Sequence, residues 1–117
     1  MKTALITGSE GQLGKTFVSK LQSLDYQVIG FDKADQVNQG IIFHQVDISK
    51  KSAIETTLNE LNQDIDLLIN NAGVSAFTPF EERTEEELDF VIGVNLKGPI
   101  LMTQEIFNRF FKPLKKG

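Results

Sequence analysis

The sequence predicts an α/β fold, a doubly wound parallel sheet of about four strands with flanking helices. Two observations support this prediction. Short apolar runs alternate with longer segments whose apolar residues recur at helical spacing, and the runs are followed by glycine, aspartate or asparagine. A strand, a helix and a further strand form a right-handed crossover, so the alternation indicates parallel strands. The expected strands are residues 3–7, 28–31, 41–46 and 67–69.

The composition is that of one globular domain. Of the 117 residues, 40% are hydrophobic and 24% are charged, which is ordinary for a folded protein. A chain of this length buries roughly 65% of its unfolded surface, which is enough for one core and not for two. We therefore expect a single domain over residues 1–117.

The charge balance and the residue types argue against several classes of function. The net charge of −4 disfavours a nucleic-acid-binding face, which needs concentrated basic residues. Cysteine is absent, which excludes disulfides and thiolate metal sites, and His44 has no partner at metal-ligand spacing. No apolar run approaches the length of a membrane span. We expect a cytoplasmic protein that binds neither a membrane nor a metal.

The helices are predicted from apolar periodicity and from end signals. Ser49 is the expected N-cap of a helix that follows the third strand. Thr84, with a glutamate three residues later, indicates a capping box at the start of a long helix, which is interrupted near Pro99 and stopped by Pro113. In the first helix, residues 12–24, the apolar positions on one face are Leu13, Phe17, Val18, Leu21 and Leu24.

A glycine-rich loop lies between the first expected strand and the first helix. Glycines there let the backbone turn tightly and approach a pyrophosphate, whose charge the helix N-terminus stabilises. The spacing is Gly-x-x-Gly-x-x-Gly, which differs from the commoner Gly-x-Gly-x-x-Gly. The loop is therefore a candidate dinucleotide-binding segment, and its residues are Gly8, Ser9, Glu10, Gly11, Gln12, Leu13 and Gly14.

A nucleoside-triphosphate loop is the alternative for this segment, because Gly14 is followed by Lys15 and Thr16. That motif requires a glycine five residues before Gly14, and position 9 is a serine. Gly8 comes one residue too early, so the loop would have the wrong size. We interpret Lys15 as a solvent-facing residue of the first helical turn.

Asp32 ends the second expected strand, a little over twenty residues past the glycine loop. A carboxylate at this place accepts hydrogen bonds from the hydroxyls of the adenosine ribose. It would repel a phosphate on that ribose, so Asp32 favours NAD over NADP, although Lys33 beside it weakens the argument. The alternative interpretation is a surface acid at the end of a strand.

The glycine loop, Asp47, the tetrapeptide Asn70–Gly73 and Asn95 together resemble the short-chain dehydrogenase/reductase family, whose nucleotide-binding half is a Rossmann-type sheet. The tetrapeptide, Asn-Asn-Ala-Gly after a buried strand, is the most specific of these features. The resemblance spans nearly the whole chain and implies that Asp47 and the backbone of Ile48 hold the adenine. The residues implied to line the rest of the cofactor channel are Asn71, Ala72, Gly73 and Val94.

The resemblance also implies a catalytic role for Asn95, as the residue that kinks the helix and positions a water in a proton relay. A buried amide can donate and accept, so it can hold a water and a free backbone carbonyl at a helix break. The alternative is a helix-kink residue without chemistry.

Two features depart from the family pattern. The glycine spacing resembles the branch that modifies nucleotide sugars, whereas Asn-Asn-Ala-Gly resembles the common branch. The family's proton-transfer pair is Tyr-x-x-x-Lys, preceded by a serine, but the only tyrosine is Tyr26 and the fourth residue after it is Gly30. Residues 111–117 resemble the loop that leads to the family's fifth strand, where the serine would lie, so we expect an incomplete catalytic site.

The sequence thus predicts the NAD(H)-binding domain of a short-chain dehydrogenase, whose parent reaction moves a hydride between NAD and an alcohol or carbonyl. A non-catalytic nucleotide-binding or interaction module that keeps the fold is the alternative, favoured by the missing tyrosine and lysine. The uncovered strand 67–69 and the apolar end of the last helix also predict a homo-oligomer. The aromatic residues at that helix end are Phe107, Phe110 and Phe111.

Overall fold

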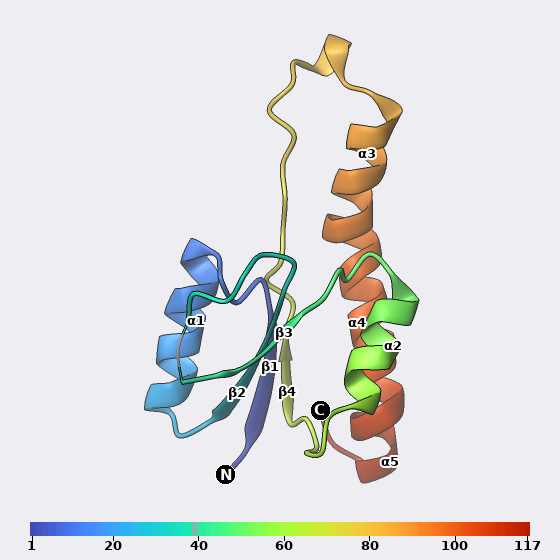
Figure 1. The fold of residues 1–117 in the computed structure, drawn as a ribbon. Helices are drawn as coiled ribbons and strands as arrows, with labels where there is room; N and C mark the ends of the chain where they lie inside the picture. The colour runs from blue at the N-terminus through green and yellow to red at the C-terminus, as the bar shows by residue number, and fades with distance from the viewer. Residues whose placement is uncertain (39) are drawn as a thin grey trace.

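The computed structural model describes residues 1–38 and 40–117 and shows four parallel strands in one sheet. The strand order is β3-β2-β1-β4, and helices cover both faces (Figure 1). The predicted α/β class with its doubly wound parallel sheet is confirmed. The strands are β1 (Thr3–Thr7), β2 (Gln27–Asp32), β3 (Ile42–Gln45) and β4 (Leu67–Ile69).

The helical segments occupy the connections and the end of the chain. Helix α1 lies on one face of the sheet, and α2 with the long C-terminal helix lies on the other (Figure 1). That long helix is built of α3, η2, α4, η3 and α5 in succession. The bounds are α1 (Gln12–Ser23), α2 (Lys51–Asn59), η1 (Phe80–Glu82), α3 (Glu85–Ile92), η2 (Gly93–Lys97), α4 (Gly98–Ile106), η3 (Phe107–Phe111) and α5 (Lys112–Leu114).

Strand β1 is the centre of the core. All five of its residues are buried, and successive side chains of a strand point to opposite faces. Ala4 and Ile6 pack with Val18 of α1 and its neighbours, whereas Leu5 packs with residues of α2 and α4 such as Ile54. The two hydrophobic clusters therefore form the two layers between sheet and helices.

The register of the strands places their carboxyl ends together. Thr7 of β1 pairs with Phe31 of β2, and Ile6 pairs with Ile69 of β4. The chain leaves β1 toward β2 and β3 and then returns to add β4 on the other side of β1. Such a reversal is a topological switch point, and ligands of open α/β sheets bind beyond the strand ends there. The fold thus positions a site next to Gly8.

The predicted interruption of the long helix near Pro99 is a change of helical type and not a break. The α-helical pattern stops at Ile92 and resumes at Gly98. The chain stays helical from Glu85 to Leu114, with the π-helical turns η2 and η3 inserted. A proline lacks the N–H and clashes with the carbonyl four residues earlier, and a wider turn before it relieves both problems. The helix also ends one residue past Pro113, at Leu114, and is followed by Lys115 in the left-handed conformation.

Two predictions of local structure are wrong and one is confirmed. Helix α2 begins at Lys51 with Lys50 as N-cap, and the hydroxyl of Ser49 is placed one residue too early, where it donates to Asp47 Oδ1 at 2.6 Å and accepts no N–H of the helix. In α1 the expected apolar face is narrower, since the side chains of Leu13 and Leu24 are 60% and 55% exposed. The Thr84 cap is confirmed, because its hydroxyl accepts the N–H of Glu87 at 3.2 Å.

No helix within residues 1–38 and 40–117 combines the length and the apolar character needed to cross a membrane.

Candidate functional site

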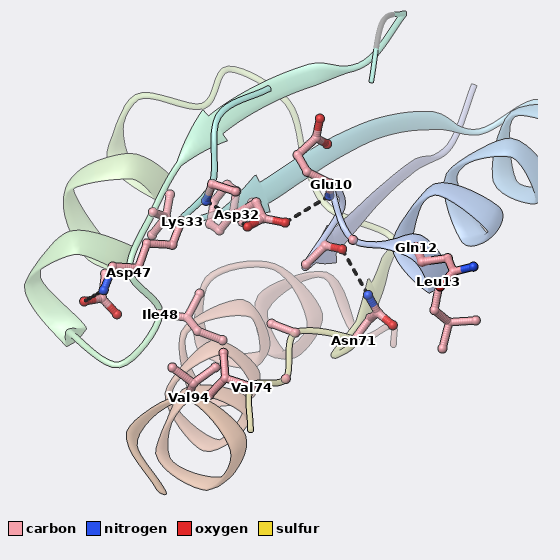
Figure 2. A pocket seen from close by; sticks show the side chains of 18 of the residues that line it. Glu10, Gln12, Leu13, Asp32, Lys33, Asp47, Ile48, Asn71, Val74 and Val94 are labelled. Atoms are coloured by element: carbon pink, nitrogen blue, oxygen red, sulfur yellow. Dashed lines mark hydrogen bonds and ion pairs between the residues drawn. The ribbon is translucent and has the colours of Figure 1, made fainter. Parts of the chain in front are cut away.

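A cavity of about 440 Å³ opens at the carboxyl ends of the strands, next to the switch point (Figure 2). It brings together residues from the glycine loop, from the ends of β2, β3 and β4, and from the long helix. Of the residues predicted to contact a cofactor, all line this cavity except Ser9, which is fully buried in the loop behind it. Residues distant in sequence thus converge on one volume.

The glycine loop can lie this close to its neighbours because a Cβ would not fit at two of its three glycines, Gly8 and Gly14. Gly8 has a φ of +70°, and a Cβ there would lie 2.8 Å from the Cα of Ala72. A Cβ on Gly14 would lie 2.0 Å from the carbonyl oxygen of Gly8. Gly11, the N-cap of α1, offers no side-chain acceptor to the first N–H groups of that helix. The helix N-terminus therefore keeps polar groups for an anion.

The tetrapeptide after β4 is bound to the end of β1. The hydroxyl of Thr7 accepts the backbone N–H groups of Asn71 at 3.1 Å and of Ala72 at 3.0 Å. The side-chain amide of Asn71 donates to the carbonyl oxygen of Gly8 at 3.1 Å (Figure 2). These bonds join the tetrapeptide to the glycine loop and to the end of β1, so the two walls of the cavity are hydrogen-bonded to each other.

Asp32 is held at the cavity wall by backbone groups on both sides. Its Oδ2 accepts the N–H of Glu10 in the glycine loop at 2.9 Å, and its Oδ1 accepts the N–H of Ala34 at 2.9 Å (Figure 2). A carboxylate has about four acceptor sites, so each oxygen keeps one lone pair. Asp32 can therefore accept a pair of ligand hydroxyls without losing its present bonds.

Asp47 is a second fixed carboxylate of the cavity. Burial raises the pKa of Asp47, but hydrogen bonds from the hydroxyl and the N–H of Ser49, with the charges of Lys33 and Lys50, outweigh burial and lower that pKa overall. The ammonium of Lys33 lies 3.9 Å from Asp47 Oδ2 and 5.7 Å from the ring centroid of Phe90. Lys33 thus pairs with Asp47 rather than with Asp32.

Asn95 lies in the π-helical turn η2 and binds the backbone that follows the tetrapeptide. Its Oδ1 accepts the N–H of Val74 and its Nδ2 donates to the carbonyl of Val74, both at 2.8 Å. The amide therefore holds a loop segment beside the cavity, and the expected free carbonyl at a helix break is not its partner. A catalytic role for Asn95 stays a prediction.

The single tyrosine lies away from the cavity. Tyr26 precedes β2 at the amino end of the sheet and packs against the α1 side of the core, whereas the cavity is at the carboxyl end. Within residues 1–38 and 40–117, no cluster of three histidine, cysteine or acidic residues could hold a metal. His44 packs edge-on against Phe31, with 6.0 Å between ring centroids.

The structure adds cavity residues that the sequence interpretation missed. Phe90 stands one helical turn before Val94, and residues four apart share a helix face, so this spacing could have identified it. The others are neighbours of predicted residues on the strand ends and loops. The added residues are Phe31, Lys33, Ala34, Val46, Val74 and Phe90.

Comparison with known proteins agrees with this geometry. The model of the short chain dehydrogenase family matches residues 2–117. An uncharacterized oxidoreductase of Schizosaccharomyces pombe is 34% identical over 99% of the chain and 47% of its own length, and a diacetyl reductase of Staphylococcus epidermidis is 31% identical over 99% and 51%.

Solved structures agree as well. A short chain dehydrogenase from Leptospira borgpetersenii with bound NAD+ is 37% identical, with a TM-score of 0.83 over 98% of this chain and 48% of its own. A 4-hydroxyisoleucine dehydrogenase complexed with NADH is 25% identical, with a TM-score of 0.90 over 99% and 52%. The chain spans about half the length of the relatives it matches. It belongs to the short chain dehydrogenase family.

Proposed function

We propose that the cavity at the strand ends binds NAD(H). The observation that carries the proposal is Asp32, whose carboxylate is held at the cavity wall by the backbone of the glycine loop. The ribose hydroxyls of the adenosine would donate to Asp32, with the adenine near Asp47 and Ile48. The pyrophosphate would lie against the loop at the N-terminus of α1, where the missing Cβ atoms of Gly8 and Gly14 allow close approach.

Charge supports the choice of NAD over the 2′-phosphorylated cofactor. A 2′-phosphate would face the carboxylate of Asp32, and like charges repel strongly in a partly enclosed site. Lys33, the nearest residue in sequence that could neutralise such a phosphate, is paired with Asp47 and lies over Phe90. The NAD+ and NADH in the two related structures are compatible with this preference.

In the proposed parent reaction a hydride moves between the nicotinamide of NAD and an alcohol or carbonyl substrate. These 117 residues would supply cofactor binding. Thr7 and Asn71 hold the two cavity walls together, and Asn95 holds the backbone of Val74 beside the cavity. We place Asn95 as a positioning residue of the cofactor channel.

The first test is calorimetric titration with NAD+ and NADP+. We expect the wild-type chain to bind NAD+ more tightly, and Asp32→Ala to narrow the difference by about tenfold, because one charged hydrogen-bonding group is removed. Asp64→Ala removes the same charge at an exposed position outside the cavity and should leave the preference unchanged. Equal affinities in the wild type would refute the role of Asp32.

A homodimer is the second proposal, and exposed apolar side chains favour it. Strand β4 lies at the edge of the sheet, and the long helix carries exposed Leu96 together with exposed Ile100 and Phe107, which line a shallow groove. Of the three phenylalanines predicted for this surface, Phe110 and Phe111 instead pack against the core. Burial of such area contributes about 25 cal/mol per Å² to association.

Light scattering during size-exclusion chromatography should give the mass of a dimer for the wild-type chain, and Ile100→Asp should shift the measured mass toward that of the monomer. A wild-type monomer at micromolar concentration would exclude the dimer.

A further inference from the structure

Glu10 occupies an unusual place for an acidic residue. It stands in the middle of the glycine-rich loop, and only 8% of its surface is exposed. Within residues 1–38 and 40–117, no lysine, arginine or histidine forms an ion pair with its carboxylate. A buried carboxylate without a cation is costly unless hydrogen bonds satisfy it. The surroundings of Glu10 therefore have to supply donors.

Four hydrogen bonds satisfy this carboxylate. Oε1 accepts the backbone N–H of Val37 and, at 2.6 Å, that of Asn38. Oε2 accepts the hydroxyl of Ser9 at 2.8 Å and the side-chain amide of Asn38 at 3.0 Å. Burial raises the pKa of Glu10, but these bonds outweigh burial and lower the pKa overall, so the side chain is a carboxylate at neutral pH.

The same residue reaches Asp32 through its backbone. The N–H of Glu10 donates to Asp32 Oδ2 at 2.9 Å, while its side chain points away from Asp32 toward the segment after β2 (Figure 2). The amide of Asn38 also donates to the carbonyl oxygen of Ser9 at 2.6 Å. Ser9 in turn packs closely against Gly30 of β2. A Cβ atom on Gly30 would lie 2.4 Å from the hydroxyl oxygen of Ser9.

These contacts form one network, with Glu10 at its centre. On one side of Glu10 is the carboxylate of Asp32, which we propose accepts hydrogen bonds from the ribose hydroxyls. On the other side is the start of the connection between β2 and β3. Residues 32–34 line the cavity, and Val37 and Asn38 are the next part of that segment bound to the glycine loop. The position of Asp32 relative to the loop thus depends on bonds at both ends of Glu10.

We propose that Glu10 is a positioning residue for cofactor selectivity, which holds Asp32 and segment 33–38 against the glycine loop so that the ribose hydroxyls meet a fixed carboxylate. The proposal rests on the proposed binding of NAD(H). Without the side chain of Glu10, the N–H groups of Val37 and Asn38 lose their acceptor, and the bond from the Asn38 amide to the carbonyl of Ser9 remains to hold this end of the segment to the loop. Asp32 then keeps its charge but is held less firmly, because Ala34, which donates to its Oδ1, belongs to the loosened segment.

The test is a titration series with NAD+ and NADP+ on the whole 117-residue chain. Glu10→Ala should weaken the binding of NAD+ more than the binding of NADP+. The preference for NAD+ should narrow about three- to tenfold, which is the effect expected from the loss of one hydrogen bond. Asn38→Ala removes the side-chain amide that donates to Glu10 and to Ser9, so it should also narrow the preference for NAD+. Glu10→Gln keeps one acceptor oxygen, so it should retain more of the preference than Glu10→Ala.

A double variant separates positioning from general stability. In Asp32→Ala, adding Glu10→Ala should leave the remaining preference unchanged, because Glu10 acts through Asp32. Circular dichroism of each variant checks that it is folded, and Glu60→Ala provides a control on the surface. If Glu10→Ala weakens the binding of both cofactors equally, the role of Glu10 is only structural and the proposal is overturned. If the wild-type chain binds neither cofactor, the proposed function fails instead.

Discussion

Gly14→Ala is expected to destabilise the fold and to abolish measurable NAD+ binding. The new Cβ would lie 2.0 Å from the carbonyl oxygen of Gly8 and 2.9 Å from its carbonyl carbon. Both of these are backbone atoms, so no side-chain rotation relieves the overlap, and the glycine loop has to move away from α1. Overpacking of this kind costs about 1–3 kcal/mol of unfolding free energy. The displaced loop would then enter the volume proposed for the pyrophosphate.

Gly11→Ala is the matched control in the same loop. A Cβ on Gly11 would lie 3.5 Å from the carbonyl oxygen of Gly8, which is an ordinary contact, and the φ of Gly11, −76°, suits alanine. Urea unfolding should show the loss of stability for Gly14→Ala and not for Gly11→Ala. Wild-type affinity in Gly14→Ala would mean that the loop does not hold the pyrophosphate.

The 117-residue chain is expected to show no dehydrogenase turnover above background on a panel of alcohols and carbonyls, even where it binds NAD(H). A positioned general acid or base contributes roughly 10²- to 10⁴-fold to the rate. The family pair Tyr-x-x-x-Lys has no counterpart in the sequence, and Tyr26 lies at the opposite end of the sheet from the cavity.

Absorbance of NADH measures this turnover directly. Tyr26→Phe should leave the background unchanged, because this side chain packs against the α1 side of the core and does not line the cavity. Turnover by the purified chain that disappears in Asn95→Ala would contradict the expectation. It would show that residues of this chain alone carry the proton transfer.

The sequence predicts the sheet well, because each strand is a short apolar run with a polar residue at its end. The segment 67–69 is predicted with its observed bounds, and Asp32 does end β2. The errors come from local competition. Ser49 was a sound helix cap by residue type, but Asp47, two residues earlier, takes its hydroxyl. A cap needs the serine oxygen to accept an N–H of the first helical turn, and a window of sequence does not show that this hydroxyl is placed to donate to Asp47 instead.

The cavity was predictable only in its outline. The glycine loop, Asp47 and the tetrapeptide were identifiable because each follows a strand and carries a recognisable pattern. The bonds of Glu10 to Val37 and Asn38 were not, since the partners are 27 and 28 residues away in a segment without periodicity. Likewise, the bonds of Asn95 to Val74 depend on how the extended segment after β4 returns beside the long helix (Figure 1).

A nuclear magnetic resonance titration of the isotope-labelled chain with NAD+ tests the dinucleotide site most directly. We predict shifts of the backbone amides in the glycine loop, at Asp32, at Asp47 and Ile48, and in the tetrapeptide after β4, because these groups surround one cavity. The shallow groove around Ile100 and Phe107 provides the internal control and should not respond. No shifts at millimolar NAD+, or shifts confined to that groove, would contradict the assignment of the cavity as a dinucleotide site.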